Sequence, residues 1–134
     1  MTTRTPYTLA ATTSHGFADT VAIARDALAA EGFGVLCEID VQATMKAKLD
    51  VDREPYIILG ACNPPLAHQA LTAEPEIGAL LPCNVVVYTA DGTTHVSAID
   101  AARMLSIVDR EDLEPVATEV RSRLERVIAA ISRA

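Results

Sequence analysis

The chain has 134 residues, the usual size of one domain, and half of them are hydrophobic, which excludes a disordered chain. Its formal charge of −7 at pH 7 argues against binding to nucleic acid or to an anionic membrane surface, because both depend on clustered Lys and Arg. Only three Tyr and two Phe are present, so the predicted core is aliphatic.

The sequence predicts one soluble domain over residues 1–134. Residues 1–13 are Thr-rich and lack a basic start followed by an apolar run, so no secretory signal is expected. No window approaches the ~20 apolar residues of a spanning helix. The three cysteines, an odd number, do not form a disulfide framework. We therefore expect free thiols and a cytoplasmic protein.

The first third of the chain is predicted to form a strand and a helix. Residues 6–11 are expected to form the strand. Ser14 is suited to cap the helix, whose apolar residues recur at helical spacing. Gly32 is expected to end this helix at C′, which would let Phe33 pack back on Leu28.

Two strands and a short helix follow. Residues 35–40 alternate as a strand that places Cys37 on the core side, together with Val35 and Ile39. Asp40 is expected to cap a short helix over 41–49. The unbroken apolar run 56–61 is typical of a central strand buried on both faces.

Two further helices are indicated. Asn63 is a good N-cap, and Pro64 suits the first helical position, so a helix is predicted over 64–73. Near the C-terminus, apolar residues from Leu113 to Ile131 form a long stripe that indicates an amphipathic helix.

A β-hairpin is predicted between these helices. The strands 83–90 and 93–100 flank Asp91-Gly92, a strong two-residue hairpin signal. This register pairs Val87 with Val96 and Val85 with Ala98 on one apolar face, and places Tyr88 opposite His95 on the other face. The Tyr88–His95 pair is interpreted as cross-strand packing or as a proton-transfer pair.

The predicted order is β-α-β-(short α)-β-α-β-β-α. It indicates an α+β fold with two layers, in which a mainly antiparallel sheet carries two long helices packed on one face. The second face of the sheet would carry Val86, Tyr88 and Ile99. A homodimer would cover that apolar surface.

A Cys-Asn pair occurs twice where a strand meets a turn, and these pairs are the candidate site: Cys62, Asn63, Cys83 and Asn84. The leading hypothesis is a small dimeric binding module that takes a small anion or a soft metal such as Cu(I) there. The alternatives are a thiol-dependent redox protein or enzyme that uses Cys62 and Cys83, and a structural or interaction protein with no small-molecule site.

The last alternative has its own support. Free cysteine often packs as a small apolar residue, and Asn-Pro-Pro begins a helix well without any ligand. A zinc site is disfavoured, because Cys62 and Cys83 lie far apart with no close second ligand, although His68 lies one helical turn after Cys62. No phosphate-binding loop, dinucleotide-binding turn or hydrolase motif is present, so neither a cofactor nor a reaction is assigned.

Three stretches carry a resemblance to a known family: EGFGVLCEID at 31–40, YIILGACNP at 56–64 and LPCNVVVY at 81–88. Together they resemble the bacterial and archaeal "domain of unknown function 302" family. The resemblance implies a compact two-layer α/β domain that tends to form homodimers, and it implies no established activity or catalytic residue. The matching positions are Gly32, Phe33, Asp40, Cys62, Asn63, Pro64, Pro82 and Cys83.

Overall fold

A single antiparallel sheet organises the chain. The computed structural model describes residues 2–3 and 5–134. The sheet has six strands in the order β1-β2-β6-β5-β4-β3, and every neighbouring pair is antiparallel. The strands are β1 (Thr2–Thr3), β2 (Thr8–Thr13), β3 (Gly34–Asp40), β4 (Tyr56–Cys62), β5 (Cys83–Ala90) and β6 (Thr93–Ile99).

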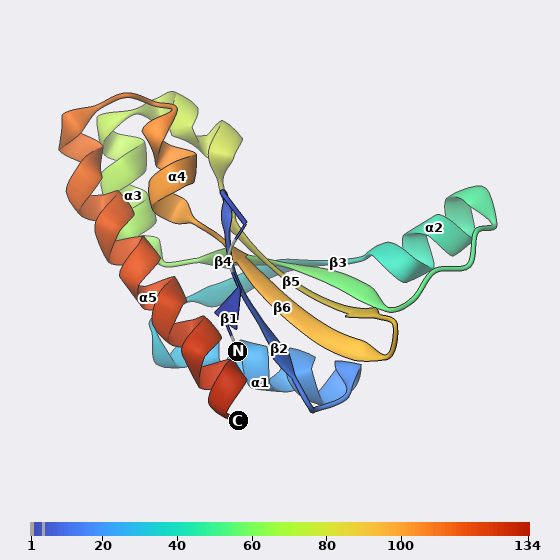
Figure 1. Ribbon diagram of the computed structural model, residues 1–134. Coiled ribbons are helices and arrows are strands. Elements are labelled where there is room, and N and C mark those ends of the chain that lie inside the picture. Colours follow the sequence, from blue (N-terminus) through green and yellow to red (C-terminus); the bar gives the residue numbers. More distant parts are fainter. Residues whose placement is uncertain (1, 4) are drawn as a thin grey trace.

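Helices cover one face of this sheet (Figure 1). The helices of this layer are α1 (Phe17–Ala30), α3 (Pro64–Ala73), α4 (Ala101–Ser106) and α5 (Glu114–Arg133), with the 3-10 turns η1 (Pro75–Leu80) and η2 (Glu111–Leu113). The predicted α+β class and its two layers are confirmed. None of the helices in the described part of the chain is both long and apolar enough to cross a bilayer.

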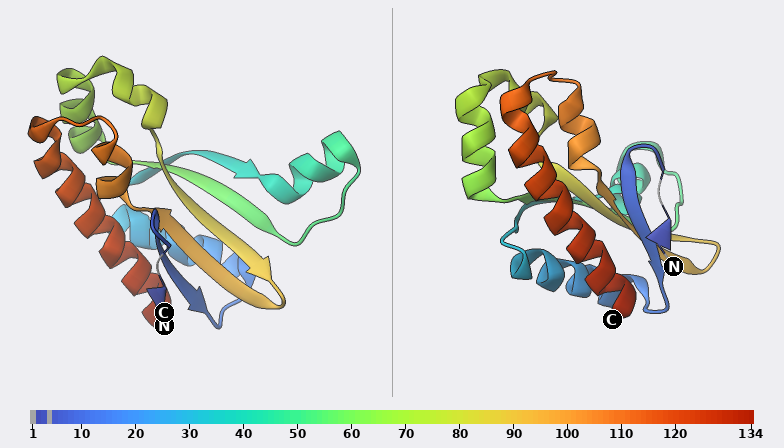
Figure 2. Two further views of the ribbon diagram at one scale, coloured as in Figure 1. Left: turned by 45° about the horizontal axis from the view of Figure 1, so that its top comes forward. Right: turned by 60° about the vertical axis from the view of Figure 1, so that its left-hand side comes forward.

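One helix stands apart from this layer. Figures 1 and 2 show α2 (Val41–Leu49) beyond the ends of the strands, carried by β3 and by the chain that returns to β4. No residue of α2 is buried. We call β3, α2 and the following residues up to Glu54 the arm.

The core lies between the sheet and the helices, and it is aliphatic as predicted. Every second residue of β5 and β6 points into it, including Val85, Val87, Val96 and Ala98, all fully buried. The apolar stripe of α5 packs on them through Leu124, Val127, Ile128 and Ile131, which are also fully buried. At about 1.5–3 kcal/mol for each buried aliphatic side chain, this contact supplies the main driving force for folding.

Local signals set several element ends as predicted. Gly32 has φ +84° and ends α1, and the Phe33 N–H donates to the Leu28 carbonyl at 2.9 Å, as in a Schellman motif. The Asp40 carboxylate accepts from the Ala43 N–H at 2.9 Å and caps α2. At the hairpin, Asp91 and Gly92 both have positive φ, as a type I′ turn requires.

The hairpin register is also as predicted. Val85 pairs with Ala98, Val87 with Val96, and Tyr88 with His95.

Other predictions need correction. Ser14 does not cap α1, whose N-cap is Gly16, without a side-chain hydrogen bond. A β-bulge between Val35 and Cys37 shifts the register against β4, so Cys37 pairs with Gly60 on the outer face. Cys37 and Ile39 are therefore exposed on the outer face and do not lie on the core side as predicted.

The element order also contains more than the sequence predicted. Strand β1, turn η1 and helix α4 lie in segments predicted as loops or left unassigned. Strand β4 is buried on the helix side, where Leu59 and Ala61 are fully buried, but its other side is half-buried at Tyr56 and Ile58.

Candidate functional site

An apolar cavity lies where the ends of β4 and β5 meet the helices. It has a volume of about 310 Å³. Residues of β3, β4, β5, α3, η1, α4 and α5 line it, and Leu36 and Leu71 are exposed where they border it. The lining residues are Phe33, Leu36, Ala61, Cys62, Asn63, Leu66, Ala67, Ala70, Leu71, Gly78, Leu81, Pro82, Cys83, Ala101, Met104, Leu105, Val116 and Val120.

Asn63 is the polar member of this lining. Its side chain is buried, at 6% exposure, and its Oδ1 accepts from the Leu66 N–H at 3.3 Å, which caps α3 as predicted. Pro64 and Pro65 follow at the first helical positions and have no N–H, while the Ala67 N–H donates to the Asn63 carbonyl at 2.9 Å. The first turn of α3 therefore offers no free backbone donor.

The structure brings Cys62 and Cys83 to the same cavity. Strands β4 and β5 pair with Ala61 opposite Cys83, so the two cysteines lie near each other across the ladder. Cys83 is buried and Cys62 is half-buried. Burial, and secondly the charge of a Cys62 thiolate, raise the pKa of Cys83 to about 11. Cys83 is therefore a neutral thiol at physiological pH, which disfavours it as a nucleophile.

Asn84 is not part of this group. It pairs with Gly60 and is exposed on the outer face of the sheet, beside Val86 and Ser97. His68 is exposed on α3 and does not line the cavity. Of the four predicted site residues, three therefore line one cavity and the fourth lies on the opposite face.

The outer face carries an aromatic ladder. The Tyr88 ring stacks on the His95 ring with centroids 4.8 Å apart, and on the Tyr56 ring at 5.3 Å. Near-parallel stacking of the imidazole on the phenol fits the packing interpretation of this pair.

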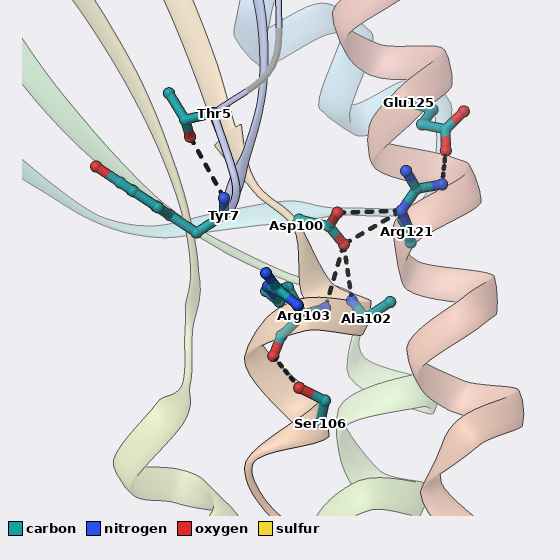
Figure 3. Close-up of polar contacts among 8 residues, drawn as sticks. All are labelled: Thr5, Tyr7, Asp100, Ala102, Arg103, Ser106, Arg121 and Glu125. Atoms are coloured by element: carbon teal, nitrogen blue, oxygen red, sulfur yellow. Dashed lines mark hydrogen bonds and ion pairs between the residues drawn. The ribbon is translucent and has the colours of Figure 1, made fainter.

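The wall of the cavity that α4 provides is held by a partly buried ion pair (Figure 3). Asp100 caps α4 by accepting from the N–H groups of Ala102 and Arg103, at 3.1 and 3.3 Å. The Arg121 Nε lies 3.2 Å from both Asp100 carboxylate oxygens, and the Arg121 guanidinium also pairs with Glu125. The cap and the ion pair together fix α4 against α5.

Sequence reasoning missed most of the apolar lining. Met104 and Leu105 belong to α4, whose signal was the capping residue Asp100 before Ala-Ala-Arg-Met-Leu. Val116 and Val120 lie in the stripe that was predicted as core, and the sequence does not show that part of that stripe borders a cavity. No group of three or more His, Cys, Asp or Glu side chains suited to a metal occurs among residues 2–3 and 5–134.

The fold and the cavity define the structural class of the protein. It is a small α+β domain with an antiparallel sheet, a helix layer on one face, and an apolar cavity at the end of the two central strands. The sequence pattern of the family "Domain of unknown function DUF302" matches residues 9–131. The chain belongs to this family, as the resemblance indicated. No curated protein matches the chain.

A solved structure agrees with this assignment. It is the crystal structure of an uncharacterized conserved protein DUF302 from Bacillus stearothermophilus, 28% identical to this chain. The match covers 94% of this chain and 98% of that chain with a TM-score of 0.87.

Proposed function

We propose that this protein is a homodimeric binding module whose cavity, bordered by α3, α4 and α5, takes a small apolar molecule. The observation that carries the proposal is the cavity itself, about 310 Å³ in volume and lined almost entirely by apolar side chains. Ligand sites are typically pockets of roughly this size or larger, with mostly apolar walls and few polar groups. The exposed side chains of Leu36 and Leu71 at its border give a ligand a route in.

The chemistry of the cavity favours an apolar ligand over the small anion or soft metal that the sequence suggested. An anion at the start of α3 needs backbone donors, but Pro64 and Pro65 have none, and the N–H groups of Leu66 and Ala67 are occupied. A soft metal needs thiolates, and burial holds the pKa of Cys83 at about 11. The same raised pKa weakens the thiol-redox alternative.

The test is binding of a neutral fluorescent apolar probe, N-phenyl-1-naphthylamine. We expect saturable binding to the wild-type protein at one site per chain. Ala67→Phe fills the cavity from α3 and should abolish this binding. Ala22→Phe makes the same change on the exposed surface of α1 and should leave binding intact. An absence of saturable binding would instead favour the structural or interaction alternative.

The dimeric part of the proposal rests on the arm. Ile39, Leu49 and Val51 are large apolar residues on the arm, and between 44% and 66% of each is exposed. Ile39 lies on the outer face of the sheet, the face that also carries the aromatic ladder. An apolar surface of this kind is typical of a protein–protein interface, and a second copy related by a two-fold axis would cover both arms.

Sedimentation velocity tests the dimer. The wild-type protein should sediment as a dimer at micromolar concentration. Ile39→Glu should give monomer, because it places a charge in the contact. Ile107→Glu, an equally drastic change at a 70% exposed residue beyond the end of α4, is the matched control and should stay dimeric. A wild-type monomer would contradict this part of the proposal.

The proposal includes the cellular compartment of this module and the class of partner that it does not bind. All three cysteines are free, which suits a reducing compartment such as the cytoplasm. The net charge of −7 disfavours nucleic acid as a partner.

A further inference from the structure

The outer face of the sheet, opposite the helix layer, carries no charged side chain on its five long strands. A sheet with one solvated face normally alternates between apolar residues and polar or charged ones. In this chain 22% of the residues are charged. Yet among the outward residues of β2 to β6, all of which the structure describes, none is Asp, Glu, Lys or Arg. The carboxylates of β3 lie on the other side, because Glu38 pairs with Leu59 and Asp40 with Ile57, both buried in the core.

A row of small and branched residues crosses the middle of this face. Ile39 pairs with Ile58, Ile58 with Val86, Val86 with Ser97, and Ser97 with Ala10, so the row spans five strands. In the single chain Ile39 is 48% exposed and the other four are half-buried. Figures 1 and 2 show the helix layer on the opposite side of the sheet. The row therefore leaves apolar area in contact with water, which favours a protein partner.

The aromatic residues of the chain gather on the same face. All three tyrosines, Tyr7, Tyr56 and Tyr88, line a hollow of about 430 Å³ there, and Tyr7 is 59% exposed. The cores of protein–protein interfaces are enriched in Tyr and depleted in charged residues. The outer face thus has the composition of an interface core and not that of a solvated sheet.

The absence of charge also indicates which partner fits. In a contact with two-fold symmetry both sides present the same surface, so a charged group near the axis faces a like charge. For a protein with a net charge of −7, an uncharged surface avoids this repulsion between copies. A different protein would be selected by charges complementary to its own, and this face offers none.

From these observations we infer that the outer faces of two copies pack against each other, sheet on sheet. The dimer then has four layers, with the two helix layers outermost and the side chains of the two sheets interdigitating between them. The outward residues of five strands, together with the arm, match the roughly 20–30 residues that each side of a stable interface supplies. The inference rests on the proposed homodimer and adds the surface that forms it, which extends from the arm across the whole sheet.

Ser97→Arg tests this surface, because Ser97 lies in the middle of the row. Sedimentation equilibrium of the full chain measures the dissociation constant of the dimer. We expect this constant to rise at least about a hundredfold, since two unpaired guanidinium groups would be buried in the contact. Thr118→Arg is the matched control. It also replaces a hydroxyl group by a guanidinium, on the exposed surface of α5 in the helix layer, and should leave the dissociation constant unchanged.

A second variant guards against a failure to fold, which far-UV circular dichroism would detect. Thr12→Arg places the same charge on β2, opposite His95 and also on the outer face. It should dissociate the dimer as Ser97→Arg does.

The outcomes separate this inference from the proposed dimer. If Ser97→Arg and Thr12→Arg stay dimeric while Ile39→Glu becomes monomeric, the contact is confined to the arm. That result would overturn the sheet-on-sheet inference and leave the proposed dimer in place. A monomeric wild-type protein, or a dimer that none of the three variants dissociates, would overturn both.

Discussion

The Cys37 thiol occupies the space beside Gly60 where a side chain would otherwise lie. A Cβ at Gly60 would be 2.5 Å from Cys37 Sγ and 2.9 Å from Pro82 Cγ. This close approach follows from the β-bulge at Leu36, which turns Cys37 onto the outer face opposite Gly60. The φ of Gly60 lies outside the left-handed region, so the backbone conformation does not require glycine there. The neighbouring atoms of Cys37 and Pro82 do.

Gly60→Ala should destabilise the protein by about 1–3 kcal/mol, the usual cost of forcing a methyl group into a packed site. A second substitution, Cys37→Ala, should restore part of this loss, because it removes the sulfur but leaves Pro82 in place. Urea unfolding of the two single variants and the double variant measures the coupling. Gly34→Ala, in open space on β3, is the control. Equal losses at Gly60 and Gly34 would contradict the packing argument.

Gly32→Ala should cost more than Gly92→Ala. Both glycines have positive φ, +84° and +78°, so both variants bear the strain of a left-handed residue, about 1 kcal/mol. At Gly92 nothing lies within 4 Å of the new Cβ, whereas at Gly32 the Asn63 amide and the Arg123 guanidinium must move. The difference in the free energy of unfolding between the two variants measures the cost of the new contacts with Asn63 and Arg123. No difference would show that both side chains move aside without cost.

Asp100→Ala should destabilise the protein by about 2–4 kcal/mol, since it removes the cap of α4 and one carboxylate partner of the partly buried Arg121. Asp100→Asn keeps a capping oxygen and should cost less. Chemical denaturation of both variants, and of Arg121→Met with its double variant, gives the coupling energy. The matched control is Asp112→Asn, in the exposed pair with Arg110, which should not move the unfolding midpoint. A coupling near zero would rule out the ion pair as the clamp on α4.

Stability should fall with rising pH through the titration of Cys83. Its pKa in the folded protein is about 11, above the ordinary value, so the folded state holds the proton more tightly than the unfolded state. The stabilisation is complete below about pH 9, the ordinary value taken for the unfolded chain, and is lost as the pH rises toward 11. Its full size is about 2–3 kcal/mol.

The measurement is the free energy of unfolding at pH 7.5 and at pH 10.5, in wild type and in Cys83→Ala. Lys and Tyr titrate in both proteins, so the difference between the two pH slopes belongs to Cys83. Between pH 7.5 and pH 10.5 the wild-type protein should lose more free energy of unfolding than Cys83→Ala. Parallel slopes in the two proteins would mean that the thiol is not buried as described.

The parts of the fold that the sequence predicted are those whose cause is local. Asn63 before Pro64 determines the start of α3, and Asp91-Gly92 determines a hairpin, whatever the rest of the chain does. The bulge at Leu36 has no such cause, because it is a mismatch between β3 and a partner strand some twenty residues later. The face of Cys37 was predicted wrongly for that reason.

The candidate site likewise has features that follow from the local sequence and features that depend on how distant segments pack. Cys62, Asn63 and Cys83 come together because β4 and β5 are neighbours in the sheet, an order that the short connections alone leave open. Asn84 follows Cys83 directly and therefore points to the other face of the strand, as alternation requires. The cavity itself is formed by seven elements, so its existence depends on how they pack, which no single stretch of sequence encodes.

The position of β2 has a consequence for how the chain folds. Strands β3, β4, β5 and β6 follow one another as neighbours in the sheet, so each can pair soon after its predecessor is in place. Strand β2 instead pairs with β6, with Thr8 opposite Ile99, and so must close a loop of most of the chain. Closing a long loop costs conformational entropy before any stabilising contact has formed to offset it. We therefore expect this pairing to form late in folding. Until then the edge of β6 is unpaired. At that edge an incompletely folded chain is most able to pair with a strand of another chain.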